Sequence, residues 1–187
     1  MDANRRHWKV LSRESVFSGG PIREVAVEHV SLPNGRHLTD YYQIRMDDFA
    51  LVFARTDAGV LVLRQYKHGL RRVCLSFPGG AVQEGESPRA AAERELLEET
   101  GHVAESWQDF GPFVTNANQF CNRAHLFLAD GCRPVSDPVD PDLEGSEILV
   151  VPETELQRPD ILSEFGLVSH VALFAIATHP GVGAWSR

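Results

Sequence analysis

Three carboxylates near the end of one expected helix are the residues of this chain best suited to chemistry. They are Glu95, Glu98 and Glu99, in the stretch GAVQEGESPRAAAERELLEETG that covers residues 80–101. At about 100° per residue, they fall within an arc of about 100° on one side of a helix. The helix dipole disfavours acids at a C-terminal end, and neighbouring carboxylates repel each other. A hard divalent cation would remove this repulsion, so the cluster predicts a site for Mg²⁺, with Mn²⁺ as the alternative.

The residues at both ends of this stretch predict the helix that would position the acids. Ser87 can cap the first turn, and Pro88 is tolerated at the first helical position. Gly101 favours the left-handed conformation in which many helices end. We therefore expect a helix between Pro88 and Gly101, with the acids in its last turns.

The spacing of the acids and their neighbours matches a known pattern. Its fixed positions in this chain are Gly80, Glu86, Arg94, Glu95, Leu96, Glu98, Glu99 and Gly101. The pattern resembles the Nudix box of Mg²⁺-dependent hydrolases that cut a diphosphate linking a nucleoside to another group. This match disfavours the alternative interpretation, an ordinary solvated acidic helix face. The box usually closes with an aliphatic residue, where this chain has His102.

The resemblance implies a role for each part of the box. It implies Glu95 and Glu99 as metal ligands, with the backbone carbonyl of Gly79 as a third, and Glu98 as the residue that binds a second ion or positions water. Structural roles are implied for Gly80, Glu86, Arg94 and Gly101. The implied chemistry is attack of water on one phosphorus of the diphosphate, while metal ions bridge its oxygens.

The general base is expected on the loop after the box. In the branch of the Nudix superfamily that this chain resembles, the general base is often a Glu. The candidates here are Glu144 and Glu147. Glu144 is favoured because it lies inside the expected loop, whereas Glu147 begins a strand. The alternative for each is an ordinary surface acid.

Residues outside the box are candidates for binding the substrate. Arg64 and Lys67 are expected phosphate contacts, and Lys67 stands where relatives usually have Arg, so it offers a point charge in place of a bidentate clamp. Tyr41 and Tyr42, together with Trp8, could stack on a base. Buried packing is the alternative for each of these aromatic residues.

The remaining elements predict an α+β fold with a mixed sheet. We expect strands at 22–32, 38–46, 51–54, 60–63, 72–77, 124–129 and 147–151, an acidic loop at 130–145 and a helix over 162–178. The order of "LPNGR", "LVLRQYKHG", the box and "AHLFLADG" is similar to the ADP-ribose pyrophosphatase branch of the superfamily. That resemblance implies an α/β/α sandwich at 48–187. It also implies an N-terminal antiparallel β subdomain at 1–47, and a homodimer in which this subdomain helps to build the partner's substrate site.

Composition excludes several classes of function. The chain has 187 residues, a net charge of −8 and three cysteines without a CxxC pair. The negative charge argues against a general binder of nucleic acid or membrane surfaces. The odd number of cysteines favours reduced thiols in a cytoplasmic protein. The longest apolar run, at 168–177, is too short to span a bilayer.

The leading hypothesis is therefore divalent-metal-dependent hydrolysis of a nucleoside diphosphate sugar such as ADP-ribose, giving a nucleoside monophosphate and a sugar phosphate. The alternatives are another nucleoside diphosphate derivative, a dinucleotide, or a non-catalytic nucleotide sensor. Two departures from the family leave the substrate open. Residues 76–80 read SFPGG where relatives often have ELPAG, and 114–120 lack the usual Ser-Pro-Gly element.

Overall fold

The computed structural model describes residues 7–139 and 145–181. The chain divides into two compact units. The first holds the residues up to 47 together with 114–123, and the second holds 48–113 and the residues from 124 onwards. Strand β10 (Phe120–Asp130) begins in the first unit and continues in the second. The two units are described one at a time.

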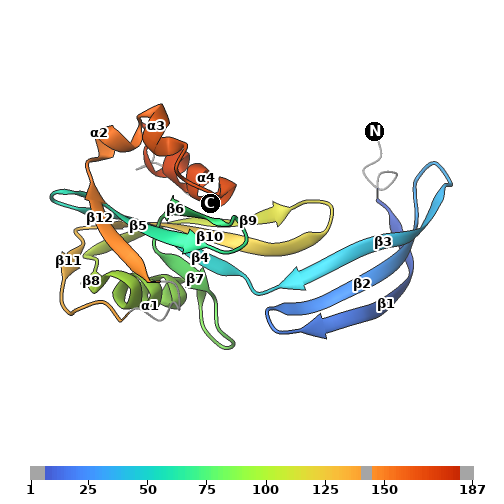
Figure 1. Ribbon diagram of the computed structural model, residues 1–187. Helices are drawn as coiled ribbons and strands as arrows, with labels where there is room; N and C mark the ends of the chain where they lie inside the picture. The colour runs from blue at the N-terminus through green and yellow to red at the C-terminus, as the bar shows by residue number, and fades with distance from the viewer. Residues whose placement is uncertain (1–6, 140–144, 182–187) are drawn as a thin grey trace. The chain divides into compact units, whose positions relative to one another are not determined.

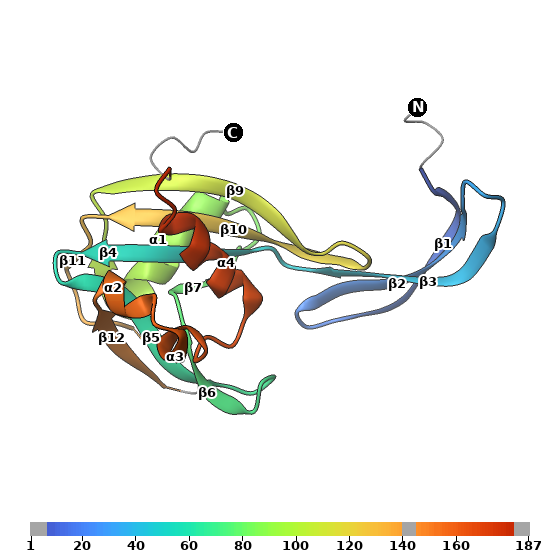
Figure 2. The ribbon, with the colours of Figure 1, turned by 90° about the horizontal axis from the view of Figure 1, so that it is seen from above.

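The first unit is built on three long antiparallel strands (Figure 2). They are β1 (Lys9–Gly19), β2 (Ile22–Ser31) and β3 (His37–Met46). The sequence predicts β2 and β3. In the turn between them, the N–H of Gly35 donates to the carbonyl of Leu32 at 2.9 Å. Strand β1 was not predicted, and every one of its residues is exposed.

The tip of the hairpin between β9 (Ser106–Asn116) and β10 also belongs to the first unit. Phe120 at the start of β10 pairs in parallel with Ile44 of β3. The carbonyl of Asn118 accepts two hydrogen bonds, from Oη of Tyr41 at 2.8 Å and from Nε2 of Gln43 at 2.9 Å. These contacts are why 114–123 groups with the N-terminal strands, although it follows the acidic helix in sequence.

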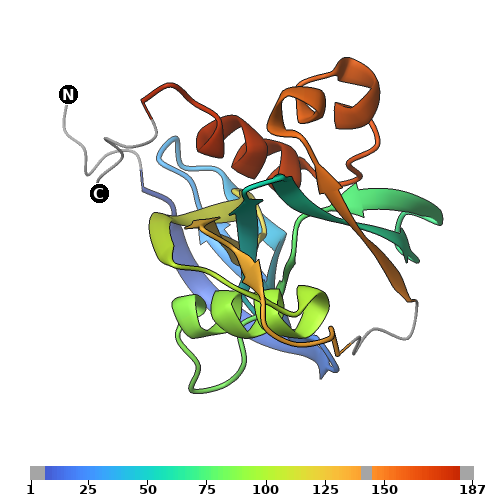
Figure 3. The same ribbon diagram turned by 90° about the vertical axis from the view of Figure 1, so that its left-hand side faces the viewer.

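The second unit has three layers, with a mixed sheet between helices (Figures 1 and 3). Strand β4 (Phe49–Thr56) runs parallel to β10 and antiparallel to β7 (Gly79–Ala81). It also pairs at its end with β5 (Gly59–Lys67), which lies between β6 (Arg72–Ser76) and β12 (Ser146–Val151). The smaller elements are β8 (His102–Val103), β11 (Arg133–Pro134), α2 (Glu153–Leu156) and α3 (Pro159–Leu162).

Alternation along β4 divides the hydrophobic core between the two faces of the sheet. Leu51 and Phe53 pack with α4 (Val168–Ala177) on one face. Ala50 and Val52 pack with α1 (Pro88–Thr100) on the other face. The β4 residues on the α1 face are small, which lets this helix lie close to that strand. The expected α/β/α sandwich is therefore confirmed.

The C-terminal helix is shorter than the sequence predicts. It was expected from residue 162, but α4 begins at Val168. Between α3 and α4 the chain turns and passes beside β6, where the N–H of Leu75 donates to the carbonyl of Glu164 at 3.1 Å and Leu75 forms an isolated bridge with Phe165. This pairing uses backbone groups that a longer helix would need. Strand β9 was also not predicted, because Gly111 and Pro112 interrupt its pattern.

Candidate functional site

The acidic helix α1 begins and ends where its capping residues predict. Oγ of Ser87 accepts a hydrogen bond from the N–H of Ala90 at 3.1 Å, and Pro88 is the first helical residue. Gly101 has φ of 70° and ψ of 14°, and its N–H donates to the carbonyl of Leu97 at 2.8 Å. Local capping therefore fixes the turn that carries the acids.

The first acid, Glu95, is buried against the glycine that opens the box. The side chain of Glu95 is on the sheet side of α1, and Gly80 lies beneath it on β7. A Cβ atom at Gly80 would overlap the Glu95 carboxylate. The absence of a side chain at this position therefore makes room for the acid.

The other two acids are held by different partners. Oε2 of Glu99 accepts the backbone N–H of Gly79 at 2.7 Å, which joins α1 to the start of β7. Nη1 of Arg94 donates to Oε1 of Glu95 at 2.7 Å and to Oε2 of Glu98 at 3.1 Å. The guanidinium therefore offsets the repulsion between these carboxylates.

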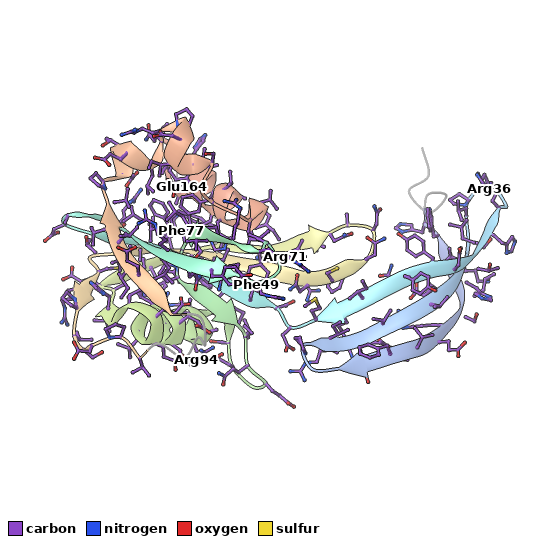
Figure 4. All side chains as sticks on the ribbon, viewed as in Figure 1. Arg36, Phe49, Arg71, Phe77, Arg94 and Glu164 are labelled. Carbon is purple, nitrogen blue, oxygen red and sulfur yellow. The ribbon has the colours of Figure 1, made fainter. Side chains whose placement is uncertain are left out.

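Arg94 also binds the loop that leads into the helix (Figure 4). Its Nε donates to Oε1 of Glu86 at 2.9 Å and its Nη2 donates to Oε2 at 3.1 Å, a two-point contact. Nη2 also donates to the carbonyl of Ala81 at 3.0 Å. Hydrogen bonding to Arg94 lowers the pKa of Glu86, and the same bond to Glu86 is the largest cause that raises the pKa of Arg94. The pair fixes the loop onto the helix.

The donor set fits a hard divalent cation that is completed by other ligands. Among the residues that the structure describes, no group of three or more His, Cys, Asp or Glu side chains is arranged so that it could hold a metal ion. Mg²⁺ commonly takes one or two carboxylates and fills its other positions with water and phosphate oxygens. Glu95 and Glu99, on one helix beside Gly79, are a donor set of that kind.

Comparison with known proteins decides the family. The NUDIX domain model matches residues 45–166. The chain belongs to the Nudix family. It is 31% identical over 150 residues to the ADP-ribose pyrophosphatase of Bacillus subtilis, covering 80% of this chain and 79% of that protein. Members of this family are hydrolases that generally use divalent metals.

Two further relatives show how widely the similarity extends. The methanol dehydrogenase activator of Bacillus methanolicus is 29% identical over 123 residues, which are 66% of each chain. The crystal structure of an ADP compounds hydrolase superposes with a TM-score of 0.75 at 20% identity, covering 96% of both chains. The second likeness establishes that the fold is shared.

Two residues expected at the Nudix site pair with each other on the far face of the sheet. Val60 and Val62 of β5 belong to the α4-side core, so alternation puts Arg64 on that side as well. Glu147 lies directly opposite Arg64 on β12, and Nη1 of Arg64 is 3.2 Å from its Oε2. The α1 acids lie on the other face. The structure therefore does not bring Arg64 and Glu147 together with them.

The remaining expected residues have separate positions. Lys67 is the last residue of β5, close enough to His170 of α4 for its charge to lower the pKa of that imidazole. Tyr41 and Tyr42 are neighbours on β3 and belong to the first unit, where Tyr41 packs edge-on against Trp8 with ring centroids 5.3 Å apart. Glu144 lies outside the described residues.

The loop after the Nudix helix makes contacts that the sequence did not signal. The N–H of Val139 donates to the carbonyl of Glu98 at 2.8 Å, and the N–H of Val135 donates to the carbonyl of Gly101 at 2.9 Å. Because these contacts use backbone atoms, residue types could not reveal them. His170 of α4 is another residue to which the sequence assigned no role, and it is the imidazole within the apolar run at 168–177. No helix in the described parts of the chain is long and apolar enough to cross a membrane.

Proposed function

We propose that this Nudix protein hydrolyses the diphosphate of a nucleoside diphosphate sugar, with ADP-ribose as the reference substrate. The observation that carries the proposal is the set of acids Glu95, Glu98 and Glu99 on one helix, held beside Gly79 and Gly80 of β7. The similarity to an ADP-ribose pyrophosphatase over four fifths of the chain supports the substrate class. The products would be a nucleoside monophosphate and a sugar phosphate.

We propose Mg²⁺ as the metal, with Mn²⁺ as a substitute, held by Glu95, Glu99 and the carbonyl of Gly79. When bound, the metal supplies charge for the phosphate oxygens and lowers the pKa of bound water. The chain itself keeps the carboxylates in place through Arg94 and the Gly79 N–H. Glu98, which is more exposed than Glu95, is left to bind a second ion or orient water.

We assign the general base to Glu144. The position of Glu147, paired with Arg64 on the α4 side, supports this choice over the alternative. Lys67, at the end of β5, is the proposed phosphate contact. We also propose a substrate and dimer subdomain at 1–47, a catalytic domain at 48–187, a homodimer, and cytoplasmic action. Light scattering on a sizing column tests the dimer directly.

The substrate is tested by hydrolysis of a panel with Mg²⁺ and with EDTA. The panel contains ADP-ribose, ADP-glucose, GDP-mannose, UDP-glucose, NADH and a diadenosine polyphosphate, with a coupling phosphatase that releases phosphate from the products. Metal-dependent cleavage of a nucleotide sugar well above the others supports the proposal. A folded, metal-bound protein that cleaves no nucleotide sugar overturns it. Cleavage of NADH or diadenosine polyphosphate alone identifies a dinucleotide hydrolase.

A further inference from the structure

His170 is a buried polar side chain on α4, the helix on the opposite face of the sheet from the acids. It is 4% exposed. Its Nδ1 accepts the backbone N–H of Phe77 at 3.0 Å. The imidazole also packs against two aromatic rings, with centroid distances of 6.0 Å to Phe77 and 6.5 Å to Phe165. Figure 4 shows Phe77 within the layer of side chains between the sheet and α4.

The N–H of Phe77 needs a side-chain partner because the strand ladder ends before it. The pairing of β6 with β5 finishes at Ser76, opposite Leu63. Phe77 itself is 1% exposed, so water does not replace the missing strand. A buried backbone donor without an acceptor is costly, and the imidazole supplies that acceptor.

The hydrogen bond also defines the protonation state of His170. An amide N–H can only donate, so Nδ1 carries no proton and the proton of the neutral ring is on Nε2. Burial, and to a smaller extent the charge of Lys67, lowers the pKa of His170 to about 4. The ring is therefore a stable acceptor around neutral pH.

Three successive residues, from Phe77 to the first residue of β7, are anchored by three different elements. The N–H of Phe77 donates to His170 of α4, at 3.0 Å. The carbonyl of Pro78 accepts the N–H of Val52 in β4 at 2.9 Å. The N–H of Gly79 donates to Glu99 of α1 at 2.7 Å. This segment is thus held from both faces of the sheet and from the strand between them.

We propose that His170 is a positioning residue for the metal site, acting through the backbone of Phe77. By fixing the start of this segment, its Nδ1 sets the direction of the Gly79 carbonyl and the place of the Glu99 carboxylate. The inference rests on the proposed roles of Gly79 and Glu99 as metal ligands. His170 would touch neither metal nor substrate. Outer residues that orient metal ligands commonly change affinity by about 10- to 100-fold when they are replaced.

Two substitutions test whether the position of the hydrogen-bond acceptor matters, because Asn and Gln carry the same amide group at different distances from the backbone. In His170→Asn the amide oxygen can take the place of Nδ1, whereas in His170→Gln it lies one bond further out. Binding of Mn²⁺ without substrate, followed by electron paramagnetic resonance, gives a readout that is independent of turnover. We expect the dissociation constant for Mn²⁺ to rise about 10-fold in His170→Gln and to stay within about 2-fold of the original in His170→Asn.

Kinetics and a packing control complete the test. Phe174→Leu reduces packing on the same helix, since Phe174 is buried against Phe53, but it leaves the Phe77 hydrogen bond in place. We expect His170→Gln to lower kcat and raise the Mg²⁺ concentration for half-maximal activity, whereas Phe174→Leu lowers only the melting temperature.

The outcomes distinguish this inference from the function on which it rests. If His170→Gln bound Mn²⁺ as tightly as the original protein, or Phe174→Leu weakened binding equally, His170 would be structural only. If His170→Gln did not fold, His170→Ala, which also removes the acceptor, would take its place, and Mn²⁺ binding as tight as in the original protein would overturn the inference. An original protein that bound no Mn²⁺ would overturn the proposed metal site itself.

Discussion

Gly80 and Glu95 face each other between β7 and α1, and a Cβ atom on the glycine would overlap the carboxylate. The acid is nearly buried and cannot move towards the sheet. Gly80 is paired with Ala50 of β4, and this strand pairing restricts movement of the glycine away from the acid. The shape of the proposed metal site therefore depends on a missing methyl group as much as on the acids.

Gly80→Ala should consequently impair catalysis more than folding. The added methyl group would displace Glu95, and we expect kcat to fall by about 10²-fold, comparable to the loss of one well-placed polar group in an active site. Circular dichroism should show a folded protein. Gly69→Ala is the control, since a Cβ atom there meets nothing within 4 Å. Equal activity of the two variants would contradict the proposed importance of the Gly80–Glu95 contact.

Glu99→Gln should abolish most of the turnover while leaving the fold intact. The amide oxygen can still accept the Gly79 N–H, but the negative charge that attracts the cation is lost. We expect kcat to decrease by about 10²-fold or more and Mg²⁺ to bind more weakly. Glu93→Gln serves as the control, because Glu93 is an exposed partner of Arg89 on the same helix. Near-normal turnover in Glu99→Gln would refute the ligand assignment.

Arg94→Ala should destabilise the protein, and Mg²⁺ should restore part of the loss. Removal of the guanidinium leaves Glu86, Glu95 and Glu98 without their shared cation. We expect a decrease of about 2 kcal/mol in the free energy of unfolding, which lowers the melting temperature by roughly 4–8 °C. Mg²⁺ binds the folded state and offsets the same repulsion.

Differential scanning calorimetry with Mg²⁺ and with EDTA checks this prediction. Arg158→Ala is the control, because Arg158 forms an exposed pair with Asp160 and its loss should leave the melting temperature almost unchanged. A melting temperature of Arg94→Ala that did not respond to Mg²⁺ would argue against a metal site beside these acids.

Glu147→Gln should leave kcat within about 2-fold of the original value, as expected for a surface pair of this kind. Glu147 is paired with Arg64 on the α4 side of the sheet, away from the acids of α1. Glu144→Gln should decrease kcat by about 10²-fold, the usual contribution of a general base. Steady-state kinetics of both variants at saturating Mg²⁺ decides between them. The reverse order of effects would transfer the role of base to Glu147.

The stability of the protein should decrease as the pH falls from about 6.5 to about 4, in part because of His170. Its pKa is lowered to about 4 in the folded protein by burial, so the unfolded chain binds a proton more readily in this range. The stability that depends on a neutral His170 is fully present above about pH 6.5 and is lost progressively below it. A pKa shift of this size corresponds to a loss of about 3 kcal/mol in the free energy of unfolding at pH 4.

Urea unfolding at a series of pH values measures this effect. Carboxylates titrate in the same range. The informative quantity is therefore the difference in the free energy of unfolding between the original protein and His170→Asn, which keeps an acceptor but cannot be protonated. That difference should narrow or reverse towards pH 4 as the original protein loses stability. A constant difference between pH 7 and pH 4 would show that His170 does not titrate as proposed.

The sequence by itself determined the acidic helix and the family. Helix α1 begins at Ser87–Pro88 and ends at Gly101 because capping depends on residues a few positions apart. Spacing within the helix also places Glu95, Glu98 and Glu99 near one another, whatever the rest of the chain does. The α+β class followed from the order of strands and helices, which local patterns reveal, and the resemblance to the family implied the sandwich.

Only the tertiary structure decided which residues share a face or a partner over long distances. The face on which Glu147 lies depends on the register of β12 against β5, and one step of register would reverse it. The bond between His170 and Phe77 joins residues 93 positions apart. Contacts of this kind depend on how the layers pack, and no short stretch of sequence carries that information.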